Sequence, residues 1–136
     1  MQKTIIDSGP LIALFDRSDK YHKIVLDFIK SYQGKLITSW AVITEVSHML
    51  DFNLQVQIDF LKWCEMGGIE VYPISQDEIS NIRVMMEKYS NIPMDLADAT
   101  LMYIANKENI KNIVSIDSDL DIYRTLKKQS LNNLLK

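Results

Sequence analysis

The stretch "KTIIDSGPLIALF", residues 3–15, joins a short β-rich run to the start of an apolar helix. Its first part favours a strand that ends at Asp7. Ser8, Gly9 and Pro10 follow, and we expect Ser8 to cap the helix, with Pro10 in its first turn. A strand followed at once by a helix is the unit from which α/β folds are built.

The same alternation of strand and helix patterns continues along the chain. It predicts strands at 35–39, 69–74 and 112–116, another short strand near the C-terminus, and helices at 20–33, 40–50, 54–66, 75–90 and 94–109. Ser39 is placed to cap one helix, Ser75 and Glu78 form a capping-box pattern, and Gly67 and Gly68 should end the helix at 54–66. We therefore expect an α/β fold: a mostly parallel central sheet of four to five strands with helices on both faces.

Length and composition are ordinary for one globular domain, with 136 residues, 47% hydrophobic and 24% charged. We expect a single domain over residues 1–136. The lone Cys64 cannot form an internal disulfide, and no apolar run approaches the ~20 residues of a membrane span. The N-terminus also lacks the basic start of a signal peptide. These features predict a cytoplasmic protein that does not enter a membrane.

The net charge of -3 disfavours a nucleic-acid partner, because phosphate binding requires clustered basic side chains. The segment 122–136 nevertheless carries Arg124, Lys127, Lys128 and Lys136 and no acid. This basic segment is either a solvated tail near a helix end or a contact surface for a phosphate backbone.

Two acidic residues directly follow predicted strands, Asp7 after the first and Asp117 after the fourth. In parallel sheets, ligands bind beyond the carboxyl ends of the strands, so these side chains share one crevice if their strands are neighbours. Taken singly, each residue is also explained as a helix cap or a turn residue. Together they suggest a site.

Three more acids lie in predicted helices. The segment "MDLADATLMYIA", residues 94–105, begins with Asp95 and Asp98, and a capping box explains Asp95 well. It explains Asp98 less well, because the surrounding apolar residues predict a helix buried almost all round, and no Lys or Arg lies within one turn. Glu45 also has apolar neighbours, although a solvated helix residue is its simpler interpretation.

These five acids offer hard oxygen ligands, and in one crevice they would repel one another unless a divalent cation neutralised them. Mg²⁺ and Mn²⁺ are the cations that carboxylate sites suit, and such sites commonly handle phosphate groups. Without these five acids, the chain has 15 basic against 13 acidic residues, a balance of +2.

Other kinds of site fail on spacing or composition. The run "DSDLDI" at 117–122 starts like a calcium-binding loop, but Ile122 stands where that loop needs Gly and Lys128 where it needs Glu. One Cys and two His cannot form a zinc site of the usual kind. The chain has no Gly-rich phosphate loop, and no Ser or Cys nucleophile stands in a recognisable setting.

In their order along the chain these acids resemble the PIN domain family, and specifically the VapC-type toxins of toxin–antitoxin pairs. The resemblance covers nearly the whole chain, from "IIDSGPLIAL" to "SIDSDLDIYR". It consists of an Asp that ends the first strand, a Glu in the helix after the second strand, an "ADA" Asp that opens a late helix, and a Ser-x-Asp that ends the next strand: Asp7, Glu45, Asp98, and Ser115 with Asp117. One departure is "DSGP" where "DTS" is frequent in the family, so only Ser8 supplies a hydroxyl after Asp7.

The resemblance implies a metal-dependent endoribonuclease that hydrolyses RNA phosphodiester bonds, usually a homodimer inhibited by an antitoxin protein. It implies that the catalytic acids, which bind Mg²⁺ or Mn²⁺, are Asp7, Glu45, Asp98 and Asp117. Asp95 is then either an added metal ligand or only a helix cap. Ser8 and Ser115 would support the acids, and the candidates for RNA backbone contacts are Arg124, Lys127 and Lys128.

Two alternatives remain beside this interpretation. A catalytically degenerate relative would bind RNA or a protein partner without cutting, although acids at all four positions argue against it. A phosphatase of the haloacid-dehalogenase type needs a second Asp two residues after the first, and Gly9 occupies that position.

Overall fold

The computed structural model describes residues 1–91, 94–116 and 131–135. Within these ranges five strands form one sheet in the order β3-β2-β1-β4-β5, and every pairing is parallel. The strands are β1 (Lys3–Ile6), β2 (Lys35–Thr38), β3 (Glu70–Val71), β4 (Asn112–Val114) and β5 (Asn132–Asn133). The predicted parallel α/β sheet is confirmed, including the short strand near the C-terminus.

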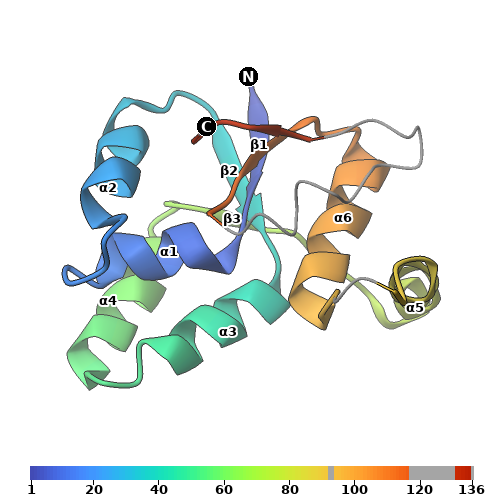
Figure 1. The fold of residues 1–136 in the computed structure, drawn as a ribbon, viewed down its shortest axis with the longest axis horizontal. Coiled ribbons are helices and arrows are strands. Elements are labelled where there is room, and N and C mark those ends of the chain that lie inside the picture. The colour runs from blue at the N-terminus through green and yellow to red at the C-terminus, as the bar shows by residue number, and fades with distance from the viewer. Residues whose placement is uncertain (92–93, 117–130, 136) are drawn as a thin grey trace.

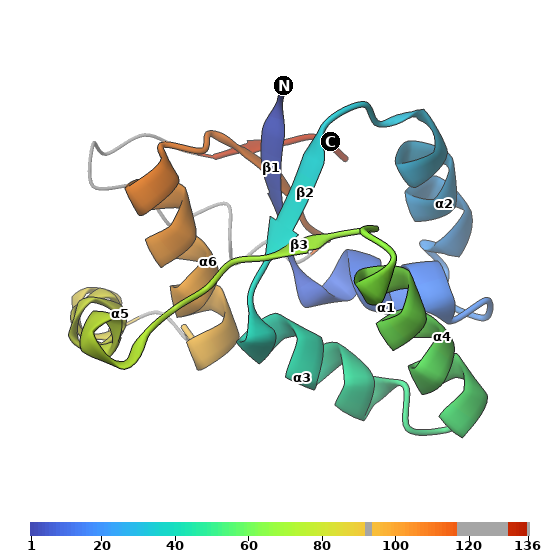
Figure 2. The ribbon, with the colours of Figure 1, turned by 180° about the vertical axis from the view of Figure 1, so that it is seen from behind.

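Helices lie on both sides of this sheet, as expected. They are α1 (Ser8–Phe15), α2 (His22–Ser31), α3 (Trp40–Met49), α4 (Leu54–Glu65), the 3-10 turn η1 (Gln76–Glu78), α5 (Ile79–Lys88) and α6 (Leu96–Glu108). In Figures 1 and 2, α2 and α4 lie on one side of β1 and β2, and α5 and α6 on the other. Helices α1 and α3 run beneath the carboxyl ends of these strands. No helix in the described ranges is long and apolar enough to cross a bilayer.

The strand order fixes where a ligand site is expected. From β1 the chain proceeds to β2 and β3 on one side, and then returns to place β4 and β5 on the other side of β1. The direction of winding therefore reverses between β1 and β4. In open parallel sheets, the crevice outside the carboxyl ends of the strands at such a reversal is the usual ligand site.

The core is formed by the central strands and the helices packed on them. In β1 Ile5 and Ile6 are fully buried, and in β4 Ile113 and Val114 are almost fully buried. Helix α6 is buried over most of its length, as the apolar sequence predicts: Ala97, Ala99, Thr100, Leu101, Met102, Tyr103, Ile104 and Ala105. Its first residue, Leu96, is an exception at 55% exposed.

The sequence prediction was wrong about the cap of α1. The cap is Asp7 rather than Ser8, because the Asp7 side chain accepts a hydrogen bond from the Ser8 backbone N–H at 2.8 Å. Ser8 is the first helical residue. The Asp7 carboxylate, at the N-cap, also interacts favourably with the helix dipole. The predicted caps Ser39 and Asp95 are confirmed, as is the Ser75–Glu78 capping box.

Two glycines end α4 where the sequence predicts, each for a different reason. Gly67 has φ +95°, a left-handed conformation that L side chains rarely adopt. Gly68 lies against the indole of Trp63, and a Cβ added there would come within 2.1 Å of the ring. Only glycine allows this close packing of the chain on Trp63.

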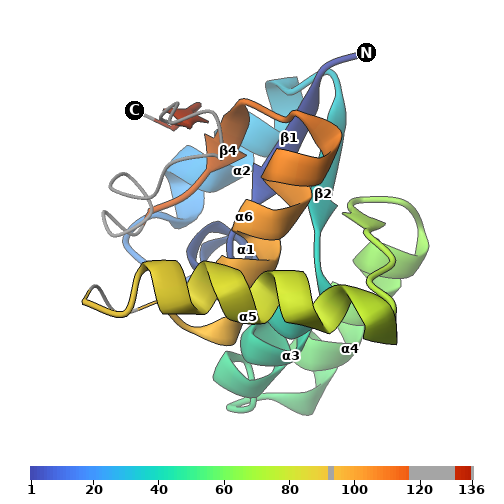
Figure 3. The ribbon, with the colours of Figure 1, turned by 90° about the vertical axis from the view of Figure 1, so that its right-hand side faces the viewer.

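Polar contacts fix α5 across α6, an arrangement seen from the side in Figure 3. The Glu78 carboxylate, at the start of α5, accepts hydrogen bonds from Lys107 at 2.9 Å and from the Tyr103 hydroxyl. Lys107, and after it Tyr103, hold the pKa of Glu78 well below its usual range. The same contact raises the pKa of Lys107. This cluster sets the relative position of the two helices.

Candidate active site

Asp7 occupies the position where the winding of the sheet reverses. Its backbone N–H donates to the Val114 carbonyl at 3.1 Å, so it joins the end of β1 to the end of β4. Its side chain is only 4% exposed. Acidic side chains are rarely this buried unless they are hydrogen-bonded or coordinate a metal. Asp7 is therefore both the cap of α1 and a buried, hydrogen-bonded acid at the edge of the sheet where ligands are expected.

The two predicted supporting serines lie beside Asp7. The Ser8 N–H binds one carboxylate oxygen, and the Ser115 hydroxyl lies 3.5 Å from the other, a long hydrogen bond. Ser115 is itself held by Asn133 of β5, whose side-chain amide donates to the Ser115 carbonyl at 2.9 Å and accepts from its N–H at 3.3 Å. The neighbouring strands thus orient the carboxylate of Asp7.

Glu45 and Asp98 lie on helices that belong to the same end of the fold. Helix α3, which carries Glu45, packs against both α1 and α6, and Asp98 is in the first turn of α6. Both side chains are half-buried. Two of the four predicted catalytic acids, Glu45 and Asp98, are therefore carried by helices that pack together, and a third, Asp7, caps α1, which packs on α3.

A buried hydrogen bond between α3 and α6 sets their spacing, and sequence reasoning missed it. The Thr100 hydroxyl donates to the Ala97 carbonyl at 2.7 Å, so the Ser39 hydroxyl is the donor in the 2.7 Å contact between Ser39 and Thr100. Both residues are nearly inaccessible to solvent. The polar Thr100 among apolar residues of α6 was the feature of the sequence that could have indicated this hydrogen bond.

Asp95 is confirmed as the N-cap of α6. Its side chain accepts from the Asp98 backbone N–H at 2.9 Å, and the residue is exposed. Capping alone therefore accounts for Asp95. The half-buried carboxylate of Asp98 is not explained by this contact, because only its backbone takes part.

The remaining predicted residues lie outside the described ranges: the fourth acid Asp117 and the basic residues Arg124, Lys127 and Lys128. Within residues 1–91, 94–116 and 131–135, no three His, Cys, Asp or Glu side chains are grouped so that they could hold a metal ion. In donor chemistry the predicted acids fit Mg²⁺ or Mn²⁺, since carboxylate oxygens are the ligands these ions prefer. Asp7, Glu45 and Asp98 lie within these ranges, so these three predicted ligands are not by themselves grouped around a metal position.

The free thiol in the described part of the chain is unsuited to nucleophilic chemistry. Burial raises the pKa of Cys64 to about 11, so the thiol is protonated at neutral pH. Cys64 lies near the end of α4 and packs, partly buried, against the core.

Comparison with known proteins identifies the fold. No family profile matches the chain. Among curated proteins, Ribonuclease VapC26 of Mycobacterium tuberculosis is 25% identical over 115 residues, which span 83% of this chain and 85% of VapC26. Among solved structures, M. tuberculosis VapC20, described as a sarcin-ricin loop cleaving toxin, superposes with a TM-score of 0.78 at 17% identity, covering 85% of this chain and 91% of VapC20. The chain has the fold of a VapC-type PIN domain.

Two toxin–antitoxin structures share this PIN fold. A toxin-antitoxin complex from Klebsiella pneumoniae superposes with a TM-score of 0.63 at 17% identity, covering 85% of this chain and 87% of the other. VapBC2 from Rickettsia felis, bound to a DNA fragment from its promoter, gives 0.57 at 12% identity, with coverage of 85% and 89%. At these identities the likeness concerns the PIN fold itself.

Proposed function

We propose that this PIN domain is an endoribonuclease, acting as the toxin of a toxin–antitoxin pair. The observation that carries this proposal is the buried carboxylate of Asp7 at the winding reversal of a chain that is similar in sequence to Ribonuclease VapC26. A hydrogen-bonded acid at the ligand-binding edge of a parallel sheet is suited to a role in binding or chemistry.

The chain's own residues would act as follows. Asp7, Glu45, Asp98 and Asp117 would hold Mg²⁺ or Mn²⁺, with Ser8 and Ser115 fixing the orientation of Asp7. When bound, such an ion polarises a phosphoryl oxygen and makes water more acidic. The acids would thereby position an RNA phosphodiester for hydrolysis, and Arg124, Lys127 and Lys128 would contact the RNA backbone on either side.

A cleavage assay with purified full-length protein tests this function. We expect cleavage of RNA in the presence of Mg²⁺ or Mn²⁺, loss of cleavage with excess chelator, and recovery when Mg²⁺ is restored. Cleavage that persists after thorough chelation would contradict the metal role alone. Absence of any cleavage with either ion would favour the alternative, a catalytically degenerate module that binds RNA or protein.

The proposed partner in the cell is an antitoxin protein. Support comes from the two toxin–antitoxin structures of similar fold. The similarity covers 87% and 89% of the matched chains in those structures. A homodimer is the proposed state of the toxin itself, and one surface of the chain is suited to it.

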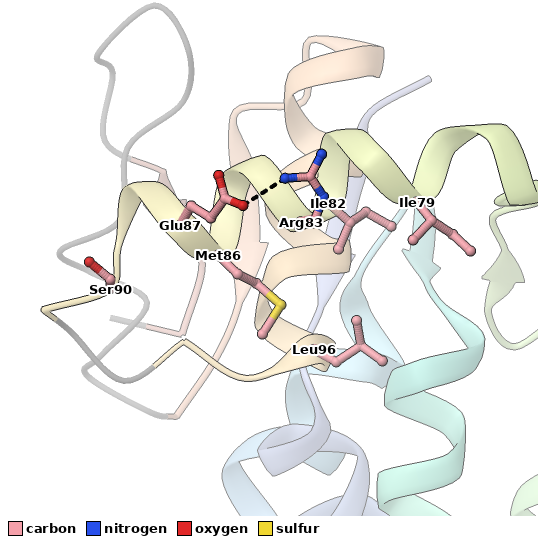
Figure 4. Close-up of a pocket in the computed structure, with 7 residues that line it drawn as sticks. All are labelled: Ile79, Ile82, Arg83, Met86, Glu87, Ser90 and Leu96. Atoms are coloured by element: carbon pink, nitrogen blue, oxygen red, sulfur yellow. Dashed lines mark hydrogen bonds and ion pairs between the residues drawn. The ribbon is translucent and has the colours of Figure 1, made fainter.

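That surface is an apolar groove between α5 and the start of α6, shown in Figure 4. It has a volume of about 450 Å³, and Ile79 and Leu96 at its edges are 58% and 55% exposed. Arg83 and Glu87 flank it and pair at 2.7 Å, so the groove carries both signs of charge on one helix. Around a two-fold axis, Arg83 can therefore face the partner's Glu87, which makes the surface complementary to a second copy.

Ile79→Glu is expected to convert the dimer to a monomer, because it places a charge in an apolar interface. Light scattering after size exclusion measures the change. Ile58→Glu on α4, another partly exposed isoleucine, is the matched control and should leave the dimer intact. The charge reversals Arg83→Glu and Glu87→Arg should each weaken the dimer, and their combination should restore it. A dimer that resists all three substitutions in the groove, Ile79→Glu, Arg83→Glu and Glu87→Arg, would place the interface elsewhere.

A further inference from the structure

The side chain of Trp40 is exposed to solvent, although its backbone forms the first turn of α3. Its side chain is 65% exposed, whereas Trp63, the other tryptophan, packs on the core with its ring 5.6 Å from that of Phe15. Tryptophan is highly buried in most proteins, because its ring is the largest apolar surface a side chain offers. An exposed ring on a rigid element suggests a binding role.

The position of Trp40 relates it to the candidate active site. It is the first residue of α3 and directly follows Ser39, whose buried hydroxyl binds Thr100 in α6. Thr100 is two residues beyond Asp98. The Trp40 carbonyl is also engaged, accepting from the Thr44 hydroxyl at 2.8 Å. Trp40 therefore follows the carboxyl end of β2 by two residues, at the edge of the sheet where Asp7 follows β1.

The chemistry of the site indicates what such a ring would bind. The acids proposed to hold the metal repel the phosphates of RNA until a cation is bound, so groups other than charge would contribute to affinity for the substrate. Single-stranded bases stack on exposed aromatic rings, and this contact carries no electrostatic penalty. We propose that Trp40 is a stacking platform for an RNA base that flanks the cleaved phosphodiester. This inference rests on the proposed ribonuclease function and adds a substrate-positioning residue to it.

Fluorescence tests the contact directly, without a need for cleavage. In excess chelator, binding of oligoadenylate should quench the emission of Trp40, measured in Trp63→Phe, in which Trp40 is the single tryptophan. Trp63→Phe also removes packing from the core, so a second measurement avoids that substitution. The quenching of Trp40 is then obtained as the difference in quenching between the wild type and Trp40→Phe. Polyphosphate, which has the charge of a nucleic-acid backbone but no bases, should not quench. Oligouridylate should quench less at equal concentration, because uracil stacks more weakly than adenine.

Kinetics separate stacking from a merely structural role. Trp40→Ala should raise the KM for single-stranded RNA about tenfold and leave kcat at saturating RNA within about twofold, in line with the loss of one stacked base. Trp40→Phe should retain most of the affinity, because a phenyl ring still stacks. Phe52→Ala, which removes another exposed aromatic ring in the turn after α3, is the matched control and should change neither constant.

The outcomes distinguish this inference from the function on which it rests. Wild-type protein that fails to cleave RNA with Mg²⁺ would overturn the ribonuclease proposal. Normal wild-type cleavage with unchanged KM for Trp40→Ala, and no quenching of Trp40 by oligoadenylate, would overturn only the stacking role. If Trp40→Ala instead lowers the oligomeric state and leaves KM unchanged, the ring is a protein contact and the inference is wrong.

Discussion

Asp7→Asn is expected to lower the rate of Mg²⁺-dependent RNA cleavage on the order of a thousandfold while the protein stays folded. The amide keeps the size of the carboxyl group and can still accept the Ser8 N–H, so the cap of α1 is preserved. What it loses is the negative charge that a metal ligand needs. We therefore expect the free energy of unfolding to change by less than about 1 kcal/mol.

Initial rates at saturating Mg²⁺ and thermal melting of the same preparations measure both effects. Asp51→Asn, which removes one charge from an exposed position between α3 and α4, is the matched control and should cleave like the wild type. A near-normal rate for Asp7→Asn would return Asp7 to a purely structural role as a helix cap. A protein that no longer folds would show that burial of Asp7 serves the core.

Much of the fold could be predicted because its elements are marked locally. Ser39, the Ser75–Glu78 box and the glycine pair after α4 each satisfy backbone groups or conformations within a few residues, so the sequence alone reveals them. The cap of α1 was misplaced by one residue because Asp7 and Ser8 are both good caps. The hydrogen bond from the Ser8 N–H to the Asp7 side chain identifies Asp7 as the cap. The contact of Asp7 with Ser115 joins residues more than a hundred positions apart, and no local pattern predicts it.

The candidate site was predictable in its parts but not in its assembly. Strand ends and helix starts marked Asp7 and Asp98, because these are the positions where parallel α/β folds gather ligands. Two contacts depend on tertiary packing, which no local pattern encodes. They are the Ser39–Thr100 hydrogen bond and the hydrogen bond from the Asn133 side chain to the Ser115 carbonyl. For the same reason the exposure of Leu96 could not be foreseen from the apolar pattern around it, which predicts a helix buried almost all round.

Asp98→Asn and Asp95→Asn are expected to differ sharply, although the two residues share one helical turn. Asp95 is an exposed cap, and Asn caps as well as Asp, so Asp95→Asn should retain both stability and cleavage. Asp95→Ala should cost about 1 kcal/mol of stability through loss of the bond to the Asp98 N–H. Asp98→Asn should lower cleavage on the order of a thousandfold, because its half-buried carboxylate is assigned to the metal.

Binding of Mg²⁺ provides a readout of this difference that does not depend on cleavage. At a hundred times its Kd, Mg²⁺ should stabilise the wild type and Asp95→Asn by about 2.7 kcal/mol, and Asp98→Asn clearly less. Melting curves with and without Mg²⁺ measure these shifts, with Ca²⁺-free buffers and a chelated reference for each variant. If Asp95→Asn loses the response as fully as Asp98→Asn, then Asp95 is a ligand as well as a cap. If Asp98→Asn responds to Mg²⁺ like the wild type, both aspartates serve only the start of α6, and the metal must be held by other residues.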